Sequence, residues 1–190
     1  MTIDPTLYTT RPEGPRPAAE LACYDLLESL AIPFVRVDHD ATPSIEACRE
    51  VERMLGIEIC KNLFLTNRQH SQFYLLMMPG DKAFRTRELS AQIGSSRLSF
   101  AGEDDMVRLL GLTPGSVSVL GLMNDRTHEV QLLIDRDVLT MDAVGCHPCV
   151  NTASLKLHME DLLTKFLPHT GHEPVVVTLM DGLEEGTAQG

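Results

Sequence analysis

The stretch "KNLFLTNRQHSQFYLLMM", residues 61–78, contains two short apolar segments, "KNLFLT" and "FYLLMM". The polar residues between them, "NRQHSQ", have the composition of a turn or loop. Two apolar segments of this length, joined in this way, predict a hairpin of two buried strands. We expect this hairpin at the centre of a sheet.

Helices and further strands are expected on both sides of the hairpin. Apolar residues at steps of three and four predict one helix between Pro17 and Pro33 and a second that follows Thr42 and ends at Gly56. The segment "FVRVDH" between these helices predicts a strand. After the hairpin, the sequence predicts the short helices "TRELSAQIG" and "EDDMVRLLG" and the strands "EVQLLID" and "VVVTLM".

These elements do not keep a strict β-α-β order along the chain. Such an order predicts an α/β (α+β) fold, in which helices surround a mixed, largely antiparallel sheet. At 190 residues, the chain has the usual size of one domain. We expect the domain at residues 17–180, after a loosely ordered lead-in at 1–16 and before a flexible acidic tail at 181–190.

The composition is that of a soluble globular protein, with 43% hydrophobic and 23% charged residues. No apolar segment approaches the roughly 18 residues of a membrane helix, and the first residues lack the pattern of a signal peptide. We therefore expect a cytoplasmic protein with no membrane partner, in which the five cysteines are reduced thiols.

The formal net charge of −11 argues against a protein that coats nucleic acid nonspecifically, because binding many phosphates needs a cationic surface. DNA is therefore not an expected partner. The basic residues nevertheless gather between Lys61 and Arg108. They would either hold a small RNA end or decorate a solvated face, and the charge pattern alone leaves both interpretations open.

The segment "GCHPCVNTAS", residues 145–154, contains a Cys-x-x-Cys pair around His147. A redox pair of the thioredoxin type needs its first sulfur at a helix N-terminus, but the residues after Cys149 have weak helical character. A structural zinc site needs four ligands, and no second Cys-x-x-Cys is present in the sequence. Both chemistries are disfavoured, and we interpret Cys146 and Cys149 as small apolar packing residues.

Three separated segments together resemble a known family. They are "CKNLFLTNRQHSQFYLLMMPGDKAFRTRELS", "GLTPGSVSVLGLMND" and "HPCVNTAS". In this order they resemble the YbaK/prolyl-tRNA synthetase-associated editing domain superfamily, and within it the free-standing prolyl-tRNA editing (Ala-tRNA(Pro) deacylase) branch. The resemblance implies a single α/β domain that hydrolyses the ester linking a wrong amino acid to tRNA, with no metal and no organic cofactor.

The resemblance places the reaction on Lys61, Asn62 and His147. Lys61 would anchor a phosphate or ribose, because a lysine in an apolar strand is costly to bury unless an anion meets it. Its alternative is a strand-edge position from which the side chain extends to water. Asn62 would offer its amide to the aminoacyl group or to the attacking water, or would make an ordinary strand-end hydrogen bond. His147 would bind the aminoacyl amine or order the water, unless it is a structural histidine.

Substrate-binding residues are expected around these three. The loop "GLTPGSVS" would aim the backbone N–H groups of Gly115 and Ser116 at a carbonyl oxygen, although an ordinary turn has the same composition. Asn151 belongs to the His-Pro segment. Ile45 and Phe64 are candidate apolar walls, with the alternative that both are ordinary core residues.

The preferred prediction is a trans-editing deacylase for Ala-tRNA(Pro). Its partners would be the acceptor end of mischarged proline tRNA and, as a candidate protein partner, prolyl-tRNA synthetase. A synthetase pocket that fits proline cannot strongly exclude alanine, since lost apolar contact is worth only about 1–3 kcal/mol. The cysteines around His-Pro depart from the family pattern and leave the edited amino acid open. The alternatives are a Cys-tRNA deacylase of the same superfamily and a noncatalytic module that binds tRNA or a synthetase.

Overall fold

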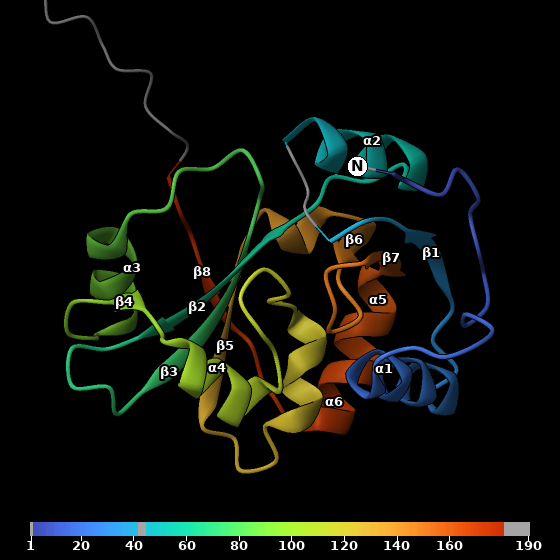
Figure 1. Cartoon of the computed structure of the whole chain (residues 1–190). Helices are drawn as coiled ribbons and strands as arrows, with labels where there is room; N and C mark the ends of the chain where they lie inside the picture. The colour runs from blue at the N-terminus through green and yellow to red at the C-terminus, as the bar shows by residue number, and fades with distance from the viewer. Residues whose placement is uncertain (1, 42–44, 181–190) are drawn as a thin grey trace, which may run out of the picture.

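Helices surround two sheets in the computed structural model, which describes residues 2–41 and 45–180, without the side chains of residues 45–47 (Figure 1). In these residues the larger sheet has the strand order β4 (Ser99–Phe100), β2 (Lys61–Thr66), β3 (Phe73–Met78), β5 (Val130–Asp135) and β8 (Val175–Val177). The smaller sheet has the order β1 (Phe34–Asp38), β7 (Ala153–His158) and β6 (Ala143–Cys146). The predicted α+β fold is confirmed.

The predicted hairpin is confirmed, and its second strand is the middle strand of the larger sheet. β2 and β3 pair antiparallel, with Lys61 opposite Met78, whereas β3 and β5 pair parallel. Neighbouring residues of a strand point to opposite faces, so Leu75 enters the main core and Leu76 enters a second core. The second core also contains Leu89 of α3 (Thr86–Ile93). Because both faces are buried, β3 is apolar throughout its length.

The predicted helices are also confirmed: α1 (Ala18–Ser29), α2 (Ile45–Leu55), α3 and α4 (Glu103–Leu110). α3 and α4 each end at a glycine in the left-handed conformation, Gly94 and Gly111, both with φ of 64°. The expected N-cap of the second helix, Thr42, lies outside the described residues. None of the helices in the described ranges is long and apolar enough to cross a membrane.

The strands β6 and β7, which flank the His-Pro segment, were not expected from the sequence. β7 pairs antiparallel with both β1 and β6, so tertiary pairing outweighs the weak local preference of "NTASLKL". The chain then continues through α5 (Met159–Asp161), the π-helical turn η3 (Leu162–Phe166) and α6 (Leu167–Thr170). Two 3-10 turns, η1 (Val119–Asn124) and η2 (Val138–Thr140), complete the elements.

The N-terminal residues, expected to be a loosely ordered lead-in, run beside β1. Tyr8 and Arg36 exchange two backbone hydrogen bonds, at 2.9 and 2.7 Å, and Asp4 N donates to Asp38 O at 2.9 Å. The Arg36 guanidinium also lies over the Tyr8 ring. These contacts extend the smaller sheet at its edge. The tail expected at 181–190 lies outside the described residues.

Candidate active site

A cavity of about 340 Å³ lies where the two sheets meet. An isolated parallel bridge between Ile59 and Gly145 joins the segment before β2 to β6. Gly145 packs closely here: a Cβ would lie 2.7 Å from Cδ1 of Ile57 and 3.1 Å from Cγ1 of Ile59, so a larger residue would require these side chains to shift. The described residues that line the cavity come from separated parts of the chain: Ile59, Cys60, Lys61, Asn62, Gly115, Val117, Gly145, Cys146, His147 and Ser154.

Lys61 and Asn62 line the cavity from the start of β2. Lys61 is exposed, and its Nζ donates to the backbone oxygen of Lys82 at 3.0 Å. The amide nitrogen of Asn62 donates to Cys60 O at 3.2 Å. Its Oδ1 is buried and has no hydrogen-bond partner among the described residues. An unpaired buried acceptor is costly, so this oxygen is suited to a donor from a ligand or a water molecule.

His147 follows directly after β6 and is held by a short loop. Its Nδ1 lies 2.8 Å from the backbone oxygen of Ala153. A carbonyl oxygen can only accept, so Nδ1 carries the proton and Nε2 of the neutral ring is an acceptor. Burial lowers the pKa of His147 below its ordinary value of 6.5; the hydrogen bond to Ala153 opposes this shift, and nearby His39 adds to it. The ring is therefore neutral at pH 7.

A second polar pair lies beside His147 and was missed by the sequence analysis: His39, directly after β1, and Ser154 in β7. The rings of His39 and His147 meet edge to face, with centroids 6.1 Å apart. His39 Nδ1 lies 3.0 Å from Asp40 O and Nε2 lies 2.9 Å from the hydroxyl of Ser154. The carbonyl requires a proton on Nδ1, so Ser154 donates to Nε2. Ser154 ends the segment "HPCVNTAS" and His39 ends "FVRVDH", but the sequence analysis selected neither for the site, because they meet only when β7 lies between β1 and β6.

The glycine-containing loop reaches the cavity through Gly115 but not through Ser116. Gly115 has φ of +86° and lines the cavity. Ser116 is buried, its N–H donates to Thr113 O at 3.1 Å, and its hydroxyl donates to the same oxygen at 2.8 Å. The expectation that Ser116 N–H faces a substrate is therefore corrected, because the turn itself uses this donor. Asn151 lies behind Gly115 and donates to Ala41 O at 3.2 Å.

One of the two expected apolar walls, Phe64, is not part of the cavity lining. Phe64 is 2% exposed and stacks on Phe73 in the main core, with centroids 5.8 Å apart. It is not among the residues that line the cavity, so its expected role is corrected. Ile45 begins α2, but its side chain lies outside the described part of the structure. The apolar lining comes instead from Ile59, Cys60, Val117 and Cys146.

Comparison with known proteins places this arrangement in a family. The family model for the aminoacyl-tRNA editing domain matches residues 39–165. The chain belongs to the aminoacyl-tRNA editing domain family. It is 35% identical to the prolyl-tRNA editing protein ProX of Acetoanaerobium sticklandii over 144 residues, which are 76% of this chain and 88% of the relative. It is 30% identical over 162 residues to prolyl-tRNA synthetase associated domain-containing protein 1 of Xenopus laevis, covering 83% of this chain and 94% of the relative.

Solved structures share the fold of this editing domain. The crystal structure of a proposed trans-editing enzyme for prolyl-tRNA synthetase matches with a TM-score of 0.65 at 19% sequence identity. The match covers 88% of this chain and 100% of that chain. At this identity the comparison shows a common fold. The family match spans Lys61, Asn62, Gly115 and His147, so all four lie inside the editing domain.

The cysteines of the editing domain that flank His147 are buried. The thiol of Cys23 in α1 donates to Cys149 Sγ at 3.1 Å, and Cys146 belongs to the main core. Burial raises the pKa of Cys146, and the pKa of Cys23 is raised by its hydrogen bond to Cys149 and by burial. Among the described residues, no group of three His, Cys, Asp or Glu side chains is arranged to hold a metal ion. These features favour packing thiols over nucleophilic ones.

Changing Cys146 and Cys149 together to alanine is expected to leave the activity of the editing domain within about threefold of wild type. The change removes two buried sulfur atoms, one of them from the cavity wall at Cys146, and costs stability of the order of 1–3 kcal/mol. Alanine keeps this wall small and apolar, and Lys61, Asn62 and His147 are unchanged. Hydrolysis of aminoacyl-tRNA by the double variant checks this prediction, with circular dichroism as the control for folding. Loss of hydrolysis by a folded variant would show that a thiol takes part.

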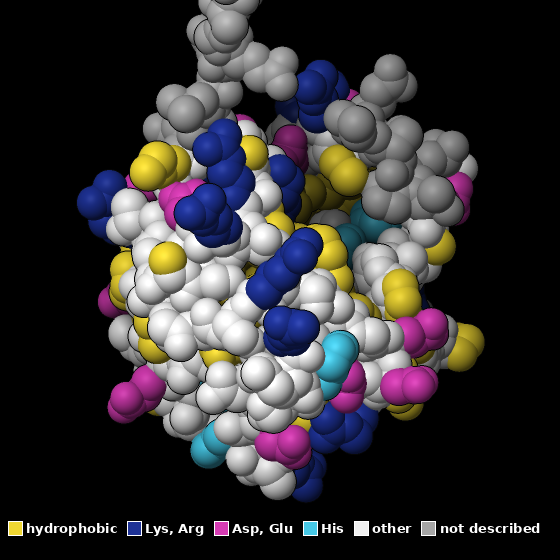
Figure 2. All heavy atoms as spheres, turned by 90° about the vertical axis from the view of Figure 1, so that its left-hand side faces the viewer, with side chains coloured by type: hydrophobic (Ala, Val, Ile, Leu, Met, Phe, Trp, Pro, Cys, Tyr) yellow, Lys and Arg dark blue, Asp and Glu magenta, His cyan; other side chains and the backbone are white. Residues whose placement is uncertain are grey.

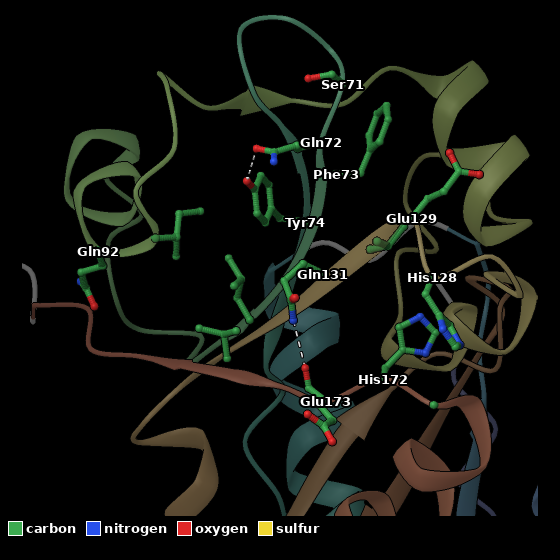
Figure 3. Close-up of a pocket in the computed structure, with 15 residues that line it drawn as sticks. Ser71, Gln72, Phe73, Tyr74, Gln92, His128, Glu129, Gln131, His172 and Glu173 are labelled. Carbon is green, nitrogen blue, oxygen red and sulfur yellow. Dashed lines mark hydrogen bonds between the residues drawn. The ribbon is translucent and has the colours of Figure 1, made fainter.

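A larger cavity of about 750 Å³ lies at the starts of β3, β5 and β8 (Figure 3). None of the predicted site residues lines it. Two pairs of polar groups around it are formed within the protein: the Tyr74 hydroxyl donates to Gln72 Oε1, and Gln131 Nε2 donates to Glu173 O, both at 2.9 Å. Nδ1 of His172, which also lines this cavity, is buried without a partner among the described residues. Because Lys61, Asn62, Gly115 and His147 line the smaller cavity and none of them lines this one, the smaller cavity is the candidate active site of the editing domain.

Proposed function

We propose that this chain is a trans-editing aminoacyl-tRNA deacylase, with Ala-tRNA(Pro) as its preferred substrate. The observation that carries the proposal is the convergence of Lys61, Asn62 and His147 on one small cavity. The relative that is named as a prolyl-tRNA editing protein supports the assignment to proline tRNA and makes prolyl-tRNA synthetase a candidate partner.

The reaction is the hydrolysis of an ester. Water adds to the ester carbonyl, the bond between the carbonyl carbon and the ribose oxygen breaks, and a free amino acid and an uncharged tRNA leave. Lys61 would hold a phosphate or ribose oxygen of the terminal nucleotide. Asn62 Oδ1 and His147 Nε2 are acceptors for the aminoacyl ammonium and the attacking water, and Gly115 remains the candidate donor to the oxyanion. Catalysis then depends on positioning and on a prearranged polar site.

The lining of the cavity supports a small amino acid as substrate. Ile59, Cys60, Val117 and Cys146 present apolar atoms without a free polar partner for a side chain. Such a wall favours a methyl group over a polar group that would lose its hydrogen bonds to water. A thiol occupies little more space than a methyl group, so Cys-tRNA is the nearest alternative substrate.

Exposed arginines support binding of an RNA backbone. Arg68, Arg85, Arg87 and Arg97 lie in or near α3 and the β2–β3 hairpin, and all four are exposed. Figure 2 shows Lys and Arg side chains spread over this side of the molecule. A local basic surface is suited to phosphates even in a chain with net charge −11.

Incubation with three charged tRNAs tests the proposed function. We expect release of alanine from Ala-tRNA(Pro), slower release from Cys-tRNA(Pro), and no release of proline from Pro-tRNA(Pro). Faster release from Cys-tRNA(Pro) would assign the chain to the cysteine-directed alternative. Binding of these tRNAs without release from any of them would overturn the enzyme assignment in favour of a binding module.

The neutral state of His147 gives the proposed reaction a defined pH dependence. A lowered pKa means that the ring takes up a proton only below pH 6.5, so the rate should hold at and above this pH and fall below it. Single-turnover rates between about pH 5 and pH 8, corrected for spontaneous ester hydrolysis, measure this profile. His147→Gln should be slower and should lack the acidic limb. An acidic limb at or above pH 6.5, or one that persists in His147→Gln, would contradict the role of the neutral ring.

A further inference from the structure

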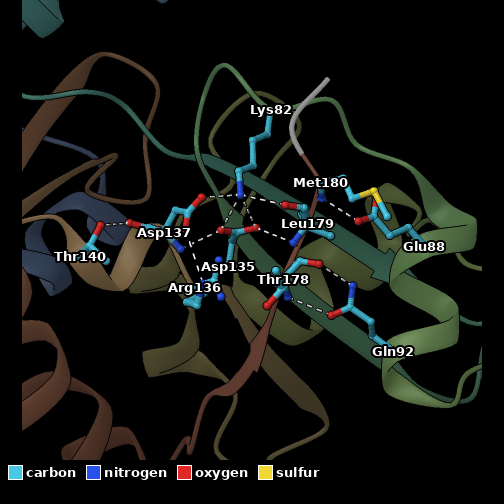
Figure 4. Close-up of polar contacts among 10 residues, drawn as sticks. All are labelled: Lys82, Glu88, Gln92, Asp135, Arg136, Asp137, Thr140, Thr178, Leu179 and Met180. Carbon is cyan, nitrogen blue, oxygen red and sulfur yellow. Dashed lines mark hydrogen bonds and ion pairs between the residues drawn. The ribbon is translucent and has the colours of Figure 1, made fainter. Parts of the chain in front are cut away.

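A buried lysine lies beside the candidate active site, in the loop between β3 and α3 (Figure 4). The Lys82 side chain is 6% exposed. Its ammonium lies 3.1 Å from Asp135 Oδ1 and 2.7 Å from Asp137 Oδ2, and it donates to Leu179 O at 2.9 Å. These three partners match the three protons of an ammonium group. All three protons of the Lys82 ammonium are therefore used within the protein, and none is left for a ligand. The role of Lys82 must lie in the segments of the chain that it joins.

Asp135, at the end of β5, joins this lysine to two other parts of the chain. The carboxylate is fully buried, and it accepts hydrogen bonds from Asp137 N at 2.8 Å and from Leu179 N at 3.0 Å. A buried ion pair is stable only when its remaining donors and acceptors are also satisfied, as they are here. The ion pair thereby fixes the loop of Lys82 against the end of β5 and the segment after β8.

The main chain of the same loop contacts the start of β2. Lys61 Nζ donates to Lys82 O at 3.0 Å. Two residues earlier, the loop passes so close to the segment before β2 that a Cβ on Gly80 would lie 2.8 Å from Ile59 O. The place of the Lys82 carbonyl, and with it that of the Lys61 ammonium, therefore depends on how firmly this loop is anchored.

We propose that the Lys82–Asp135 ion pair is a positioning device for the deacylation, which anchors the loop at residues 79–85 so that the Lys82 carbonyl orients the Lys61 ammonium at the cavity. Lys82 and Asp135 are positioning residues that act through Lys61 and touch no substrate. The inference rests on the proposed function, because that function assigns Lys61 to the reaction. A purely structural ion pair would stabilise the fold equally well but would not affect Lys61.

The chain offers a matched control at the opposite end of β5. Asp125 is 2% exposed and accepts hydrogen bonds from Glu129 N and Val130 N. Its side-chain partner is His172, at 2.9 Å. Asp125 and Asp135 are thus buried carboxylates with the same number of backbone donors, but only Asp135 is linked to Lys61. Asp135→Asn and Asp125→Asn should have comparable effects on folding and different effects on the reaction.

Single-turnover hydrolysis is the first measurement. At saturating enzyme, Asp135→Asn and Lys82→Met should slow hydrolysis of Ala-tRNA(Pro) by roughly 10- to 100-fold, the range expected when a catalytic group is displaced by about 1 Å. Asp125→Asn should keep the wild-type rate at a temperature where all variants are folded.

The double variant tests whether the two residues act together. In a Lys61→Ala background, adding Asp135→Asn should not slow hydrolysis further, because both changes act on the same interaction of Lys61. Equal slowing in both backgrounds would overturn the proposal, as would a wild-type rate in Asp135→Asn. Because Asp137 still pairs with Lys82 in Asp135→Asn, this variant tests the proposal even if Lys82→Met does not fold.

Nuclear magnetic resonance of the Lys61 ammonium gives a second measurement that does not depend on hydrolysis. Its signal is assigned by its absence in Lys61→Ala, and its relaxation reports how firmly the group is held. Asp135→Asn should make the ammonium more mobile, and Asp125→Asn should not. If wild type hydrolyses none of the charged tRNAs while this pattern is seen, the proposed function fails and the positioning stands. If wild type hydrolyses Ala-tRNA(Pro) but Asp135→Asn leaves the Lys61 signal unchanged, the function stands and the positioning fails.

Discussion

Replacing Lys61 with alanine is expected to slow hydrolysis of Ala-tRNA(Pro) by about 100- to 1,000-fold under single-turnover conditions, the range typical of removing one prearranged electrostatic group. Among the described residues that line the cavity, Lys61 is the only lysine or arginine. Without it, the terminal nucleotide loses its cationic anchor, and the ester is no longer held in register with His147 and Asn62. The folded state should be little affected, because the side chain is exposed.

Lys165→Ala is the matched control for this variant. Lys165 also donates from Nζ to a backbone oxygen, that of Ala31 at 3.2 Å, and it pairs with Asp161 away from the cavity. Its replacement should leave the rate unchanged. A wild-type rate in Lys61→Ala would remove Lys61 from the reaction. Equal slowing in both variants would indicate a general effect of charge on tRNA binding.

Replacing Asp125 with alanine is expected to lower the free energy of unfolding by about 3–5 kcal/mol, as removal of one partner from a buried ionic or polar pair usually does. Asp125 Oδ1 accepts from Glu129 N at 3.0 Å, while Oδ2 accepts from Val130 N at 2.8 Å and lies 2.9 Å from His172 Nε2. Alanine leaves all three nitrogens without this partner, and the hydrogen bonds from Val130 and His172 are buried. Because a domain of this size is only marginally stable, much of its stability would be lost.

Denaturant unfolding measures this loss, and Asp105→Ala provides the control. Asp105 pairs with Arg108 on the surface, at 3.0 Å, with half of the arginine side chain exposed. Exposed pairs of this kind are worth about 0–1 kcal/mol, so the control should be near wild type. Equal losses in both variants would show that the buried network around Asp125 does not stabilise β5. At temperatures where Asp125→Ala is folded, its hydrolysis rate should be normal, because Asp125 does not line the candidate site.

The sequence predicted the parts of the fold whose signals are local. β2 and β3 were found from two apolar segments and a polar turn, and α3 and α4 from apolar spacing closed by Gly94 and Gly111. β6 and β7 were missed because each depends on distant partners: β7 pairs with β1, which is far from it in the sequence. Strands of this kind form because of contacts with distant residues, which outweigh the local preference of the segment. A short stretch of sequence does not contain these contacts.

Some residues of the candidate site were likewise predicted from the sequence, and others were not. Lys61, Asn62, Gly115 and His147 were selected from motifs, and the structure brings them to one cavity. The expected roles of Phe64 and Ser116 were wrong because their surroundings use them otherwise: one stacks in the core, and the other closes its own turn.

By itself, the sequence determined the family, the order of the main helices and strands, and the residue types available for the reaction. These follow from apolar periodicity, turn residues and motifs, which are properties of neighbouring residues. Only the tertiary structure decided which of these residues meet. The bridge between Ile59 and Gly145 brings His147 to Lys61, and the burial of Lys82 against Asp135 makes a loop carbonyl available to the Lys61 ammonium. The bridge and the ion pair both join segments that are distant in the sequence. They form because polar groups that are buried away from water must be paired within the protein.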